Sequence, residues 1–551
     1  MHTTPSKTAL LSLQDLSIDL PTGGDRVQAL AGVNLEVRRG EILCVVGESG
    51  SGKSLTAAAV LGLLPDGVAV SAGRIAWGGE DLLTASPERL RRLRGKEIGM
   101  IFQEPMTALN PLHTIGDQIG ELLRAHTRLG RRDIQEKILA LLASVQIASP
   151  AQAAGAYPHQ LSGGQRQRAM IAMALALEPQ LLIADEPTTA LDVTTQAQIL
   201  KLIHDLQRRR GTAVLFITHD FGVVADIADR VAVMQKGVLV ETGTAQQVLD
   251  HPRHPYTRAL IAAVPPLQPA PRQRTGAGTA ALTITGLSKT YGRRRWLQRD
   301  ARVTHALNQV SLDLPAGSTL GIVGESGSGK STLARNVLGL LLPDAGEIRV
   351  FGAPVELDTA AGRRHHAAQV QMVFQDPYGS LNPRRRVGDI VAQGPIAHGR
   401  TRAAAWKKAR ELFDLVGLSP DALERYPHEF SGGQRQRIGL ARALAMEPKI
   451  LVADEPVSAL DVSVQAQVLE LLARLQDQLQ LSILFITHDL RVAAQVCDRI
   501  AVMRAGQVVE MGDSVDIFEH ASHPYTRALL AAVPGRHWTP GAVQRELAVD
   551  A

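Results

Sequence analysis

The chain has 551 residues, of which 45% are hydrophobic and 21% charged, a composition that excludes disordered and fibrous proteins. Its formal charge of +5 at pH 7 is small for this length, so charge alone identifies no class of partner. No apolar run reaches the roughly 18 residues of a membrane span, and the N-terminal segment lacks the pattern of a secretory signal. We therefore expect a cytosolic globular protein. Its two cysteines, Cys44 and Cys497, have apolar neighbours and are expected in the core.

The first functional pattern in chain order is GESGSGKS at 47–54, which follows an apolar run at 41–47 that is expected to be a strand. This octet fits the Walker A pattern G-x-x-x-x-G-K-[ST], in which glycines turn backbone N–H groups toward a polyphosphate and the lysine neutralises its oxygens. The alternative is a glycine-rich turn that binds no ligand. The octet follows a strand pattern and precedes a helical pattern, which is the context that a Walker A loop requires, so a phosphate site is favoured. The expected nucleotide-binding residues are Gly47, Glu48, Ser49, Gly50, Ser51, Gly52, Lys53 and Ser54.

Acidic residues and a histidine follow two further strand patterns. The run at 181–185 ends in Asp185, which is placed to hold Mg²⁺, and Glu186 follows it as a candidate for polarising the attacking water. The run at 213–220 contains His219, which is expected to contact the γ-phosphate. An acidic pair that only solubilises a strand end and a structural histidine are the alternatives. The Walker A pattern upstream favours the catalytic interpretation.

All of these motifs recur in the second half of the chain, at a constant offset of 269 for the later motifs (431 minus 162) and of 277 for the octet (324 minus 47). Such an offset indicates two copies of one domain. In both copies apolar β-branched runs alternate with helical patterns such as 194–209 and 464–479, which predicts an α/β fold with a parallel sheet covered by helices. The second set of site residues is Gly324, Glu325, Ser326, Gly327, Ser328, Gly329, Lys330, Ser331, Asp454, Glu455 and His488.

The expected domains are residues 1–265 and 281–551, joined by a linker at 266–280. The linker sequence PLQPAPRQRTGAGT is rich in Pro, Gln, Gly and Ala and shows no apolar periodicity, which is typical of a short flexible connection.

An S-G-G-Q sequence stands at 162–165 and at 431–434, each time before an amphipathic helical pattern and 24 residues before the candidate catalytic glutamate (186 minus 162). Together with the other motifs, it resembles the signature of ATP-binding-cassette ATPases over the whole chain. The resemblance implies two tandem P-loop NTPase domains, each with a mostly parallel core sheet, an antiparallel β subdomain and a helical subdomain. It also implies that Ser162, Gly164 and Gln165 complete the nucleotide pocket of the other cassette, and that Ser431, Gly433 and Gln434 do so in return.

The resemblance assigns several further residues. Gln103 and Gln375 match the Q-loop, which senses Mg²⁺, and Asp192 and Asp461 match the D-loop, which communicates between cassettes. The implied Mg²⁺ ligands are Ser54, Gln103 and Asp185 in the first copy and Ser331, Gln375 and Asp454 in the second. Tyr291 suits the adenine-stacking position of the second copy, or is a strand-end tyrosine, whereas the first copy offers only Leu20 or Pro21 there. Because both copies hold every catalytic residue, two hydrolytic sites are expected.

Two kinds of segment resemble those of importers of oligopeptides, dipeptides and nickel: the stretches after each Q-loop, and the sequence HPYTRAL at 254–260 and 523–529. The basic insertion at 293–302 resembles a segment of the dipeptide importer branch. HPYTRAL is interpreted mainly as a Pro-started helix packing on the cassette, because one histidine per copy does not make a metal site. The basic insertion is equally compatible with a solvated hairpin.

The resemblance thus implies an ATP-hydrolysing, energy-coupling subunit of a peptide importer, with ATP and Mg²⁺ as cofactors. Its expected partners are two integral-membrane permease subunits and, indirectly, an extracytoplasmic substrate-binding protein, with no nucleic acid. Its expected location is the cytoplasmic face of the inner membrane. Two alternatives remain: a nickel or glutathione importer ATPase of the same family, and a soluble, ribosome-associated tandem-cassette translation factor. The short linker disfavours the second alternative.

Overall fold

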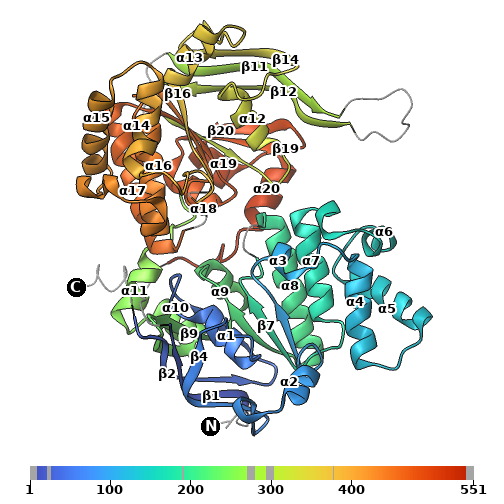
Figure 1. The fold of residues 1–551 in the computed structure, drawn as a ribbon. Coiled ribbons are helices and arrows are strands. Elements are labelled where there is room, and N and C mark those ends of the chain that lie inside the picture. Colours follow the sequence, from blue (N-terminus) through green and yellow to red (C-terminus); the bar gives the residue numbers. More distant parts are fainter. Residues whose placement is uncertain are drawn as a thin grey trace, which may run out of the picture. The chain divides into compact units, whose positions relative to one another are not determined.

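The computed structural model describes residues 9–21, 26–188, 191–269, 279–292, 303–376, 378–458 and 460–540. The chain forms two compact units, one made of residues 1–264 and 534–551 and the other of residues 265–533 (Figure 1). Each unit contains a four-stranded and a six-stranded sheet. Part of the expected linker, residues 270–278, and the basic insertion at 293–302 lie outside the described residues.

The six-stranded sheet of the first unit has the strand order β10-β9-β3-β8-β7-β6. All neighbouring strands are parallel except β10 and β9. The central strands β3, β7 and β8 are buried at every position, which is why their sequences are continuous apolar runs rather than alternating ones. The strands are β3 (Ile42–Val46), β6 (Ile98–Ile101), β7 (Leu181–Asp185), β8 (Ala213–Ile217), β9 (Arg230–Gln235) and β10 (Val238–Thr244).

The second unit repeats this sheet in the order β16-β17-β18-β13-β19-β20, again with a single antiparallel pair, β19 and β20. The expected alternation of strands and helices around a parallel sheet is therefore confirmed in both copies. The strands are β13 (Thr319–Val323), β16 (Val370–Val373), β17 (Ile450–Asp454), β18 (Ser482–Ile486), β19 (Arg499–Arg504) and β20 (Gln507–Asp513).

A separate antiparallel sheet completes the β structure of each unit, with the orders β2-β1-β4-β5 and β12-β11-β14-β15. Its long strands carry several register shifts, which bend and twist them over the parallel sheet. The strands are β1 (Ala9–Asp19), β2 (Gln28–Arg38), β4 (Ala69–Trp77), β5 (Glu80–Asp81), β11 (Ala280–Tyr291), β12 (Thr304–Pro315), β14 (Ala345–Val350) and β15 (Ala353–Pro354).

Some helices contact the parallel sheet. Others form a helical subdomain in the part of the chain between β6 and β7 of the first unit and between β16 and β17 of the second. In the first unit they are α1 (Lys53–Val60), α2 (Pro87–Leu93), α3 (Pro105–Ala108), α4 (Ile115–His126), α5 (Arg131–Ser144), α6 (Pro150–Ala154), α7 (Gly163–Ala174), α8 (Val193–Arg210), α9 (Phe221–Ile227), α10 (Ala245–Asp250) and α11 (Pro255–Ala262). In the second they are α12 (Lys330–Val337), α13 (Ala360–Gln369), α14 (Val387–Ala397), α15 (Arg402–Leu415), α16 (Gly432–Leu444), α17 (Val462–Leu479), α18 (Leu490–Val496), α19 (Ser514–His520) and α20 (Pro524–Ala531).

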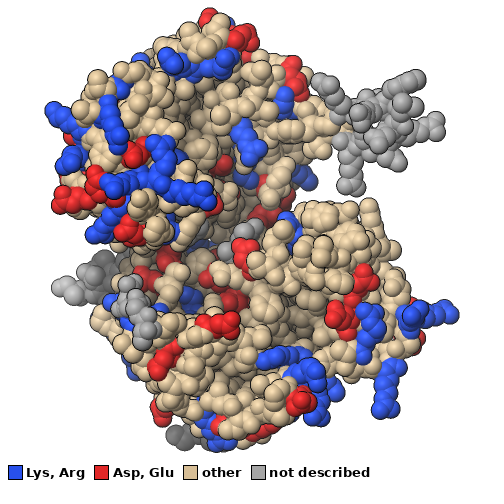
Figure 2. Space-filling view, viewed as in Figure 1, with Lys and Arg blue, Asp and Glu red and all other residues tan. Residues whose placement is uncertain are grey.

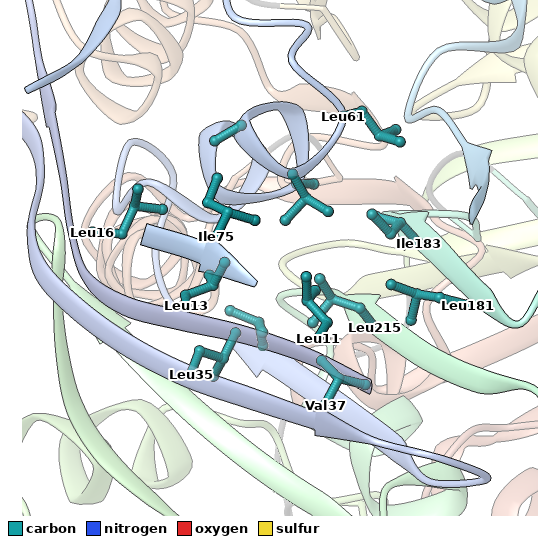
Figure 3. Close-up of a cluster of buried hydrophobic side chains, with 14 of the residues drawn as sticks. Leu11, Leu13, Leu16, Leu35, Val37, Leu61, Ile75, Leu181, Ile183 and Leu215 are labelled. Carbon is teal, nitrogen blue, oxygen red and sulfur yellow. The ribbon is translucent and has the colours of Figure 1, made fainter. Parts of the chain in front are cut away.

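The two sheets of the first unit share one hydrophobic core (Figure 3). Leu11 and Leu13 of β1 lie in the same buried cluster as Leu181 and Ile183 of β7 and Leu215 of β8. Burying a side chain of this size contributes about 1.5–3 kcal/mol, so the contact between the sheets fixes the strands that carry the functional loops.

The surface of the molecule carries charges of both signs. Figure 2 shows acidic and basic side chains interspersed on the visible face of both units, with uncharged surface between them. In the part of the chain that the structure describes, no helix combines the length and the apolar composition needed to cross a membrane.

Both cysteines are buried, as expected, and neither forms a disulfide. Burial raises the pKa of the Cys44 thiol, which keeps it protonated and unreactive. Cys497 follows α18 and packs against Gly321 of β13, where an added Cβ atom would lie 2.6 Å from the Cys497 sulfur. The missing side chain of Gly321 is therefore what makes room for Cys497.

We predict that Gly321→Ala lowers the free energy of unfolding of the second unit by about 1–3 kcal/mol, because the new methyl group overlaps the Cys497 sulfur. Urea denaturation of the full chain measures this loss, and adding Cys497→Ala should restore part of it. Gly439→Ala is the matched control, since a Cβ there meets no atom of the described chain within 4 Å. Equal losses from Gly321→Ala with and without Cys497→Ala would contradict the overlap.

Candidate active site

The Walker A loop of the first cassette turns tightly between β3 and α1. Gly47, Gly50 and Gly52 have φ angles of 151°, 73° and 101°, a region that side chains other than glycine rarely adopt. At Gly47 an added Cβ would also lie 2.2 Å from the carbonyl oxygen of Met234. Gly324, Gly327 and Gly329 repeat these features in the second cassette. The glycines of the motif are thus required by backbone conformation and by close packing.

The Walker A lysine lies buried inside its own loop. The Lys53 Nζ donates hydrogen bonds to the carbonyl oxygens of Gly47 at 2.7 Å and Glu48 at 2.9 Å. Lys330 makes the same two contacts, with Gly324 and Glu325, at the same distances. Its ammonium group is therefore held where the loop would surround a phosphate, and it can exchange carbonyl oxygens for phosphate oxygens.

The aspartate at the end of β7 lies beside the Walker A serine. Ser54 Oγ donates a hydrogen bond to Asp185 Oδ1 at 3.0 Å, which brings two oxygen ligands to one place. Burial raises the pKa of Asp185 to about 6, and the neighbouring Glu186 charge adds to this against the opposing effects of Ser54 and Lys53. Burial likewise raises the pKa of Asp454 to about 6 in the second cassette. Both aspartates are thus poised to gain from a nearby cation.

The candidate catalytic glutamate is held from two sides. Glu186 Oε2 accepts a hydrogen bond from the Gln103 amide at 3.2 Å, and Oε1 lies 3.3 Å from His219 Nδ1. The second cassette repeats this cluster around Glu455, with Gln375 at 2.7 Å and His488 at 3.1 Å.

Both glutamates have a φ angle of 46°, an unusual conformation for a residue other than glycine. Backbone strain of this kind persists where the surrounding structure enforces it, and it is concentrated at functional sites. The backbone N–H of each glutamate donates to the end of the adjacent strand, to Ile217 O or to Ile486 O, at 2.9 Å. The sheet therefore enforces the conformation that presents the carboxylate to Gln and His.

The histidine and glutamate of the second cassette favour each other's charged forms. Burial opposes charge on both side chains, but their contact lowers the pKa of Glu455 and raises that of His488. A carboxylate that stays ionised close to a phosphate site is suited to accept a proton from water.

The signature residues form a different kind of site, at the N-terminus of α7. Ser162 Oγ accepts the N–H of Gln165 at 3.3 Å, and Gln165 Oε1 accepts the N–H of Ser162 at 3.1 Å. Ser431 and Gln434 form the same capping box on α16. In the second cassette an added Cβ on Gly433 would lie 2.3 Å from a side-chain carbon of Val464, so only glycine fits there without a shift of Val464. The structure places these residues on the helical subdomain and the other site residues at the sheet.

The remaining assigned positions have ordinary structural surroundings. Asp192 caps α8, where its Oδ1 accepts the N–H of Thr195 at 2.9 Å. Tyr291 ends β11 and is 41% exposed, and Leu20 packs against the core of the first unit. Arg26 donates a hydrogen bond to the carbonyl oxygen of Gly50 in the Walker A loop, a contact that sequence analysis did not identify.

A tyrosine that was not predicted as a site residue contacts the Walker A loop. HPYTRAL was expected to pack a helix on the cassette, but the hydroxyl of Tyr256 in this motif accepts the backbone N–H of Glu48 at 3.1 Å. Tyr525 accepts the N–H of Glu325 at 3.2 Å in the same way. Recurrence of the motif in both copies was the available signal, but the partner lies about 200 residues earlier in the chain and nothing in the sequence identifies it.

Comparison with known proteins identifies the family. The family described as ABC transporter matches residues 30–189 and 307–458, which contain both Walker A loops and both candidate catalytic glutamates. The chain belongs to the ABC transporter family. The family described as oligopeptide/dipeptide transporter, C-terminal region, matches residues 240–301 and 509–545. The resemblance drawn from the sequence motifs is therefore confirmed, as are the tandem-cassette fold and the ATPase class.

Relatives match the cassette pair over nearly its full length. The peptidoglycan transport ATP-binding protein YejF of Agrobacterium fabrum is 48% identical over 95% of this chain and 96% of its own length. The glutathione import ATP-binding protein GsiA of Salmonella choleraesuis is 46% identical over 95% of this chain and 89% of its own. A solved dimeric structure of the bacterial cassette MJ0796 is 28% identical and covers 43% of this chain, with a TM-score of 0.39.

We predict that Asp185→Asn stabilises the nucleotide-free cassette near pH 8 by about 1–3 kcal/mol. Burial raises the pKa of Asp185 from its ordinary value of 3.8 to about 6. The folded protein therefore loses stability as the pH rises from about 4 through 6, where the buried carboxyl must ionise. Asparagine removes that loss and still accepts the Ser54 hydrogen bond, so its advantage should shrink toward pH 4. Urea denaturation with a metal chelator measures both conditions.

The matched control for this prediction is Asp192→Asn. Burial raises the pKa of Asp192, but hydrogen bonds from Thr195 and Thr194 outweigh it and lower the pKa below its ordinary value. This substitution should therefore give no stabilisation near pH 8. A stabilisation by Asp185→Asn that is independent of pH would contradict the role assigned to its buried charge.

Proposed function

We propose that this chain is the ATP-hydrolysing, energy-coupling subunit of an importer for peptides or peptide-like cargo. The observation that carries the enzymatic part is the cluster of glutamate, glutamine and histidine beside the Walker A loop, which occurs in both cassettes. The C-terminal region shared with oligopeptide and dipeptide transporters supports the importer part, as do the transport and import roles named for its relatives. The same names favour an importer over a ribosome-associated translation factor.

The described side chains fit a Mg²⁺-bound nucleotide. Mg²⁺ prefers a few protein oxygens together with water and phosphate oxygens, and Ser54 and Asp185 offer such oxygens at 3.0 Å from each other. Among the described residues, no group of three or more His, Cys, Asp and Glu side chains could hold a metal ion by itself, which is consistent with a metal that arrives with the nucleotide. We propose Ser54, Gln103 and Asp185, with Ser331, Gln375 and Asp454, as its ligands. When bound there, Mg²⁺ would neutralise charge on the phosphate oxygens.

Different residues of the chain would bind the phosphates and activate the attacking water. Lys53 exchanges the carbonyl oxygens of Gly47 and Glu48 for phosphate oxygens, and the loop N–H groups surround the phosphates. Glu186 accepts a proton from the attacking water. His219 lies beside Glu186, so it orients the glutamate carboxylate, and it would contact the γ-phosphate of the bound nucleotide.

We further propose that each signature helix serves the nucleotide of the opposite cassette, Ser431 and Gly433 with Lys53, and Ser162 and Gly164 with Lys330. Free N–H groups at a helix N-terminus bind anions, and the capping boxes of α7 and α16 orient these termini. Two complete sets of residues support two hydrolytic sites.

The surface beside each Q-loop is suited to a membrane partner. In the first cassette Phe102, Met106 and Leu112 are 37%, 52% and 81% exposed, and in the second Phe374 and Tyr378 are 41% and 63% exposed. Exposed apolar side chains grouped along the chain mark interaction sites. Because they differ between the cassettes, we propose two different permease subunits at the cytoplasmic face of the inner membrane, with cargo delivered by an extracytoplasmic binding protein. Glutathione or nickel remain alternative cargoes.

We predict that the double substitution Glu186→Gln and Glu455→Gln lowers the ATP turnover of the purified chain by about 100-fold or more while leaving ATP binding intact. Glutamine keeps the size of the side chain but cannot accept the proton. The control is Glu178→Gln with Glu447→Gln, which changes glutamates at equivalent, partly exposed positions with the same φ angle of 55°. Near-normal turnover in the first variant would remove both glutamates from the catalytic role.

The importer function predicts that this glutamine variant, held with ATP in detergent-solubilised cells, co-purifies with two different multi-span membrane proteins. Mass spectrometry of the complex identifies them and indicates the cargo. Adding Met106→Glu and Tyr378→Glu should release both proteins without affecting ATP binding, because charge is placed on the apolar docking surface. Recovery of ribosomal proteins instead would make the chain a translation factor.

A further inference from the structure

The C-terminal extension of each cassette contacts the Walker A loop through one hydroxyl group. Tyr256 and Tyr525 occupy equivalent positions in the first turn of α11 and α20. Each hydroxyl accepts the N–H of the second residue of the octet, Glu48 at 3.1 Å or Glu325 at 3.2 Å. The contact occurs in both copies, so it is a feature of the fold.

The rest of the motif holds this tyrosine in place. The His254 side chain caps α11, with Nδ1 accepting the N–H of Tyr256 at 3.2 Å, and Pro255 starts the helix with the backbone angle that a first turn needs. Glu241 of β10 accepts the N–H groups of Arg253 and His254 at 2.7 and 3.1 Å. His523 and Glu510 repeat this arrangement in the second cassette. The histidine is thus a helix cap, and the proline and glutamate that recur beside it in both copies fix the direction of the tyrosine.

The tyrosine and the Walker A lysine bind the same short stretch of backbone. Lys53 donates hydrogen bonds to the carbonyl oxygens of Gly47 and Glu48, and the Tyr256 hydroxyl accepts one from the N–H of Glu48. When nucleotide binds, the lysine must leave these oxygens for the phosphates, whereas the tyrosine bond does not compete with the ligand. After that exchange the tyrosine still restrains the start of the loop, so less backbone freedom is lost on binding.

We propose that Tyr256 and Tyr525 are positioning residues, which hold the Walker A loop of their own cassette in its nucleotide-binding conformation and so make ATP affinity depend on the C-terminal extension. This proposal rests on the proposed function, because it assumes that the loop binds ATP.

The ring of the second tyrosine also contacts a cation. The Arg504 guanidinium lies 4.8 Å from the centre of the Tyr525 ring, and the equivalent residue of the first cassette is Gln235 (504 minus 269). A cation over an aromatic face stabilises the ring position. Arg504→Gln should therefore weaken the restraint on the loop of the second cassette.

The test replaces each tyrosine with phenylalanine, which keeps the ring and removes only the hydroxyl. Binding of a fluorescent ATP analogue to the full chain should weaken about 3- to 10-fold at the altered site, the range expected for one hydrogen bond. The other site should stay unchanged in each single variant. The KM for ATP should rise while kcat at saturating ATP changes less than about twofold, because the hydroxyl touches no reacting atom.

Ile261→Val is the matched control for a general weakening of the extension. Ile261 is buried in the same helix, so this change should lower the melting temperature without changing ATP affinity. The proposal is overturned if the phenylalanine variants bind ATP as tightly as the unaltered chain, or if affinity falls equally in Ile261→Val. Failure of the unaltered chain to bind ATP would instead contradict the proposed function itself.

Discussion

The site depends on one constraint, the common edge at which neighbouring parallel strands end. In each cassette four adjacent strands, β3, β8, β7 and β6 in the first, lie in register with their carboxyl ends together. The Walker A loop leaves β3, His219 follows β8, Asp185 ends β7, and Gln103 follows β6. Ligands of open α/β sheets bind at this edge. Residues as far apart in the chain as Ser54 and Asp185, 131 positions, therefore meet because the hydrogen bonds of the sheet align their strands.

This arrangement places stress on the structure. Two aspartates are buried beside a second carboxylate, and two glutamates adopt a left-handed backbone conformation. Each feature destabilises the nucleotide-free protein, since buried charge and backbone strain both oppose folding. The hydrophobic core that joins the two sheets compensates for this. The proposed cation and phosphate would make the same charges favourable. Stability is thus sacrificed where the chemistry requires it.

The sequence predicted the parts of this site that depend on local pattern. The Walker A octet, the acidic pair after a buried strand and the signature helix have fixed spacings, and the strand at 181–185 was located to the residue. The order of the strands in the antiparallel sheets, by contrast, depends on pairings between distant segments. The tyrosine contact has the same origin, because a hydrogen bond donated by the backbone N–H of Glu48 does not depend on which side chain that loop residue carries. The contact of Arg26 with Gly50 also involves only a carbonyl group of the loop.

Differences between the copies show which constraints act on side-chain volume rather than on chemistry. The first cassette has Cys44 on the central strand, where the second has Gly321, and Ala228 after the following helix, where the second has Cys497 (321 minus 44 and 497 minus 228 give the two offsets of the repeat). Where the strand residue of the second cassette has no side chain, the residue that packs against it has gained a sulfur atom, which fills the space. The candidate phosphate-binding, metal-binding and catalytic residues, which carry charges and hydrogen-bonding groups, are identical in both copies. A packing position can exchange volume with its neighbour, whereas a carboxylate or an ammonium group has no neighbour that can take over its charge at the required point. The tyrosine hydroxyl in the C-terminal extension is unchanged in the same way, while the residue beneath its ring differs, as expected if the hydrogen bond to the Walker A loop is the function and the ring contact only adjusts it.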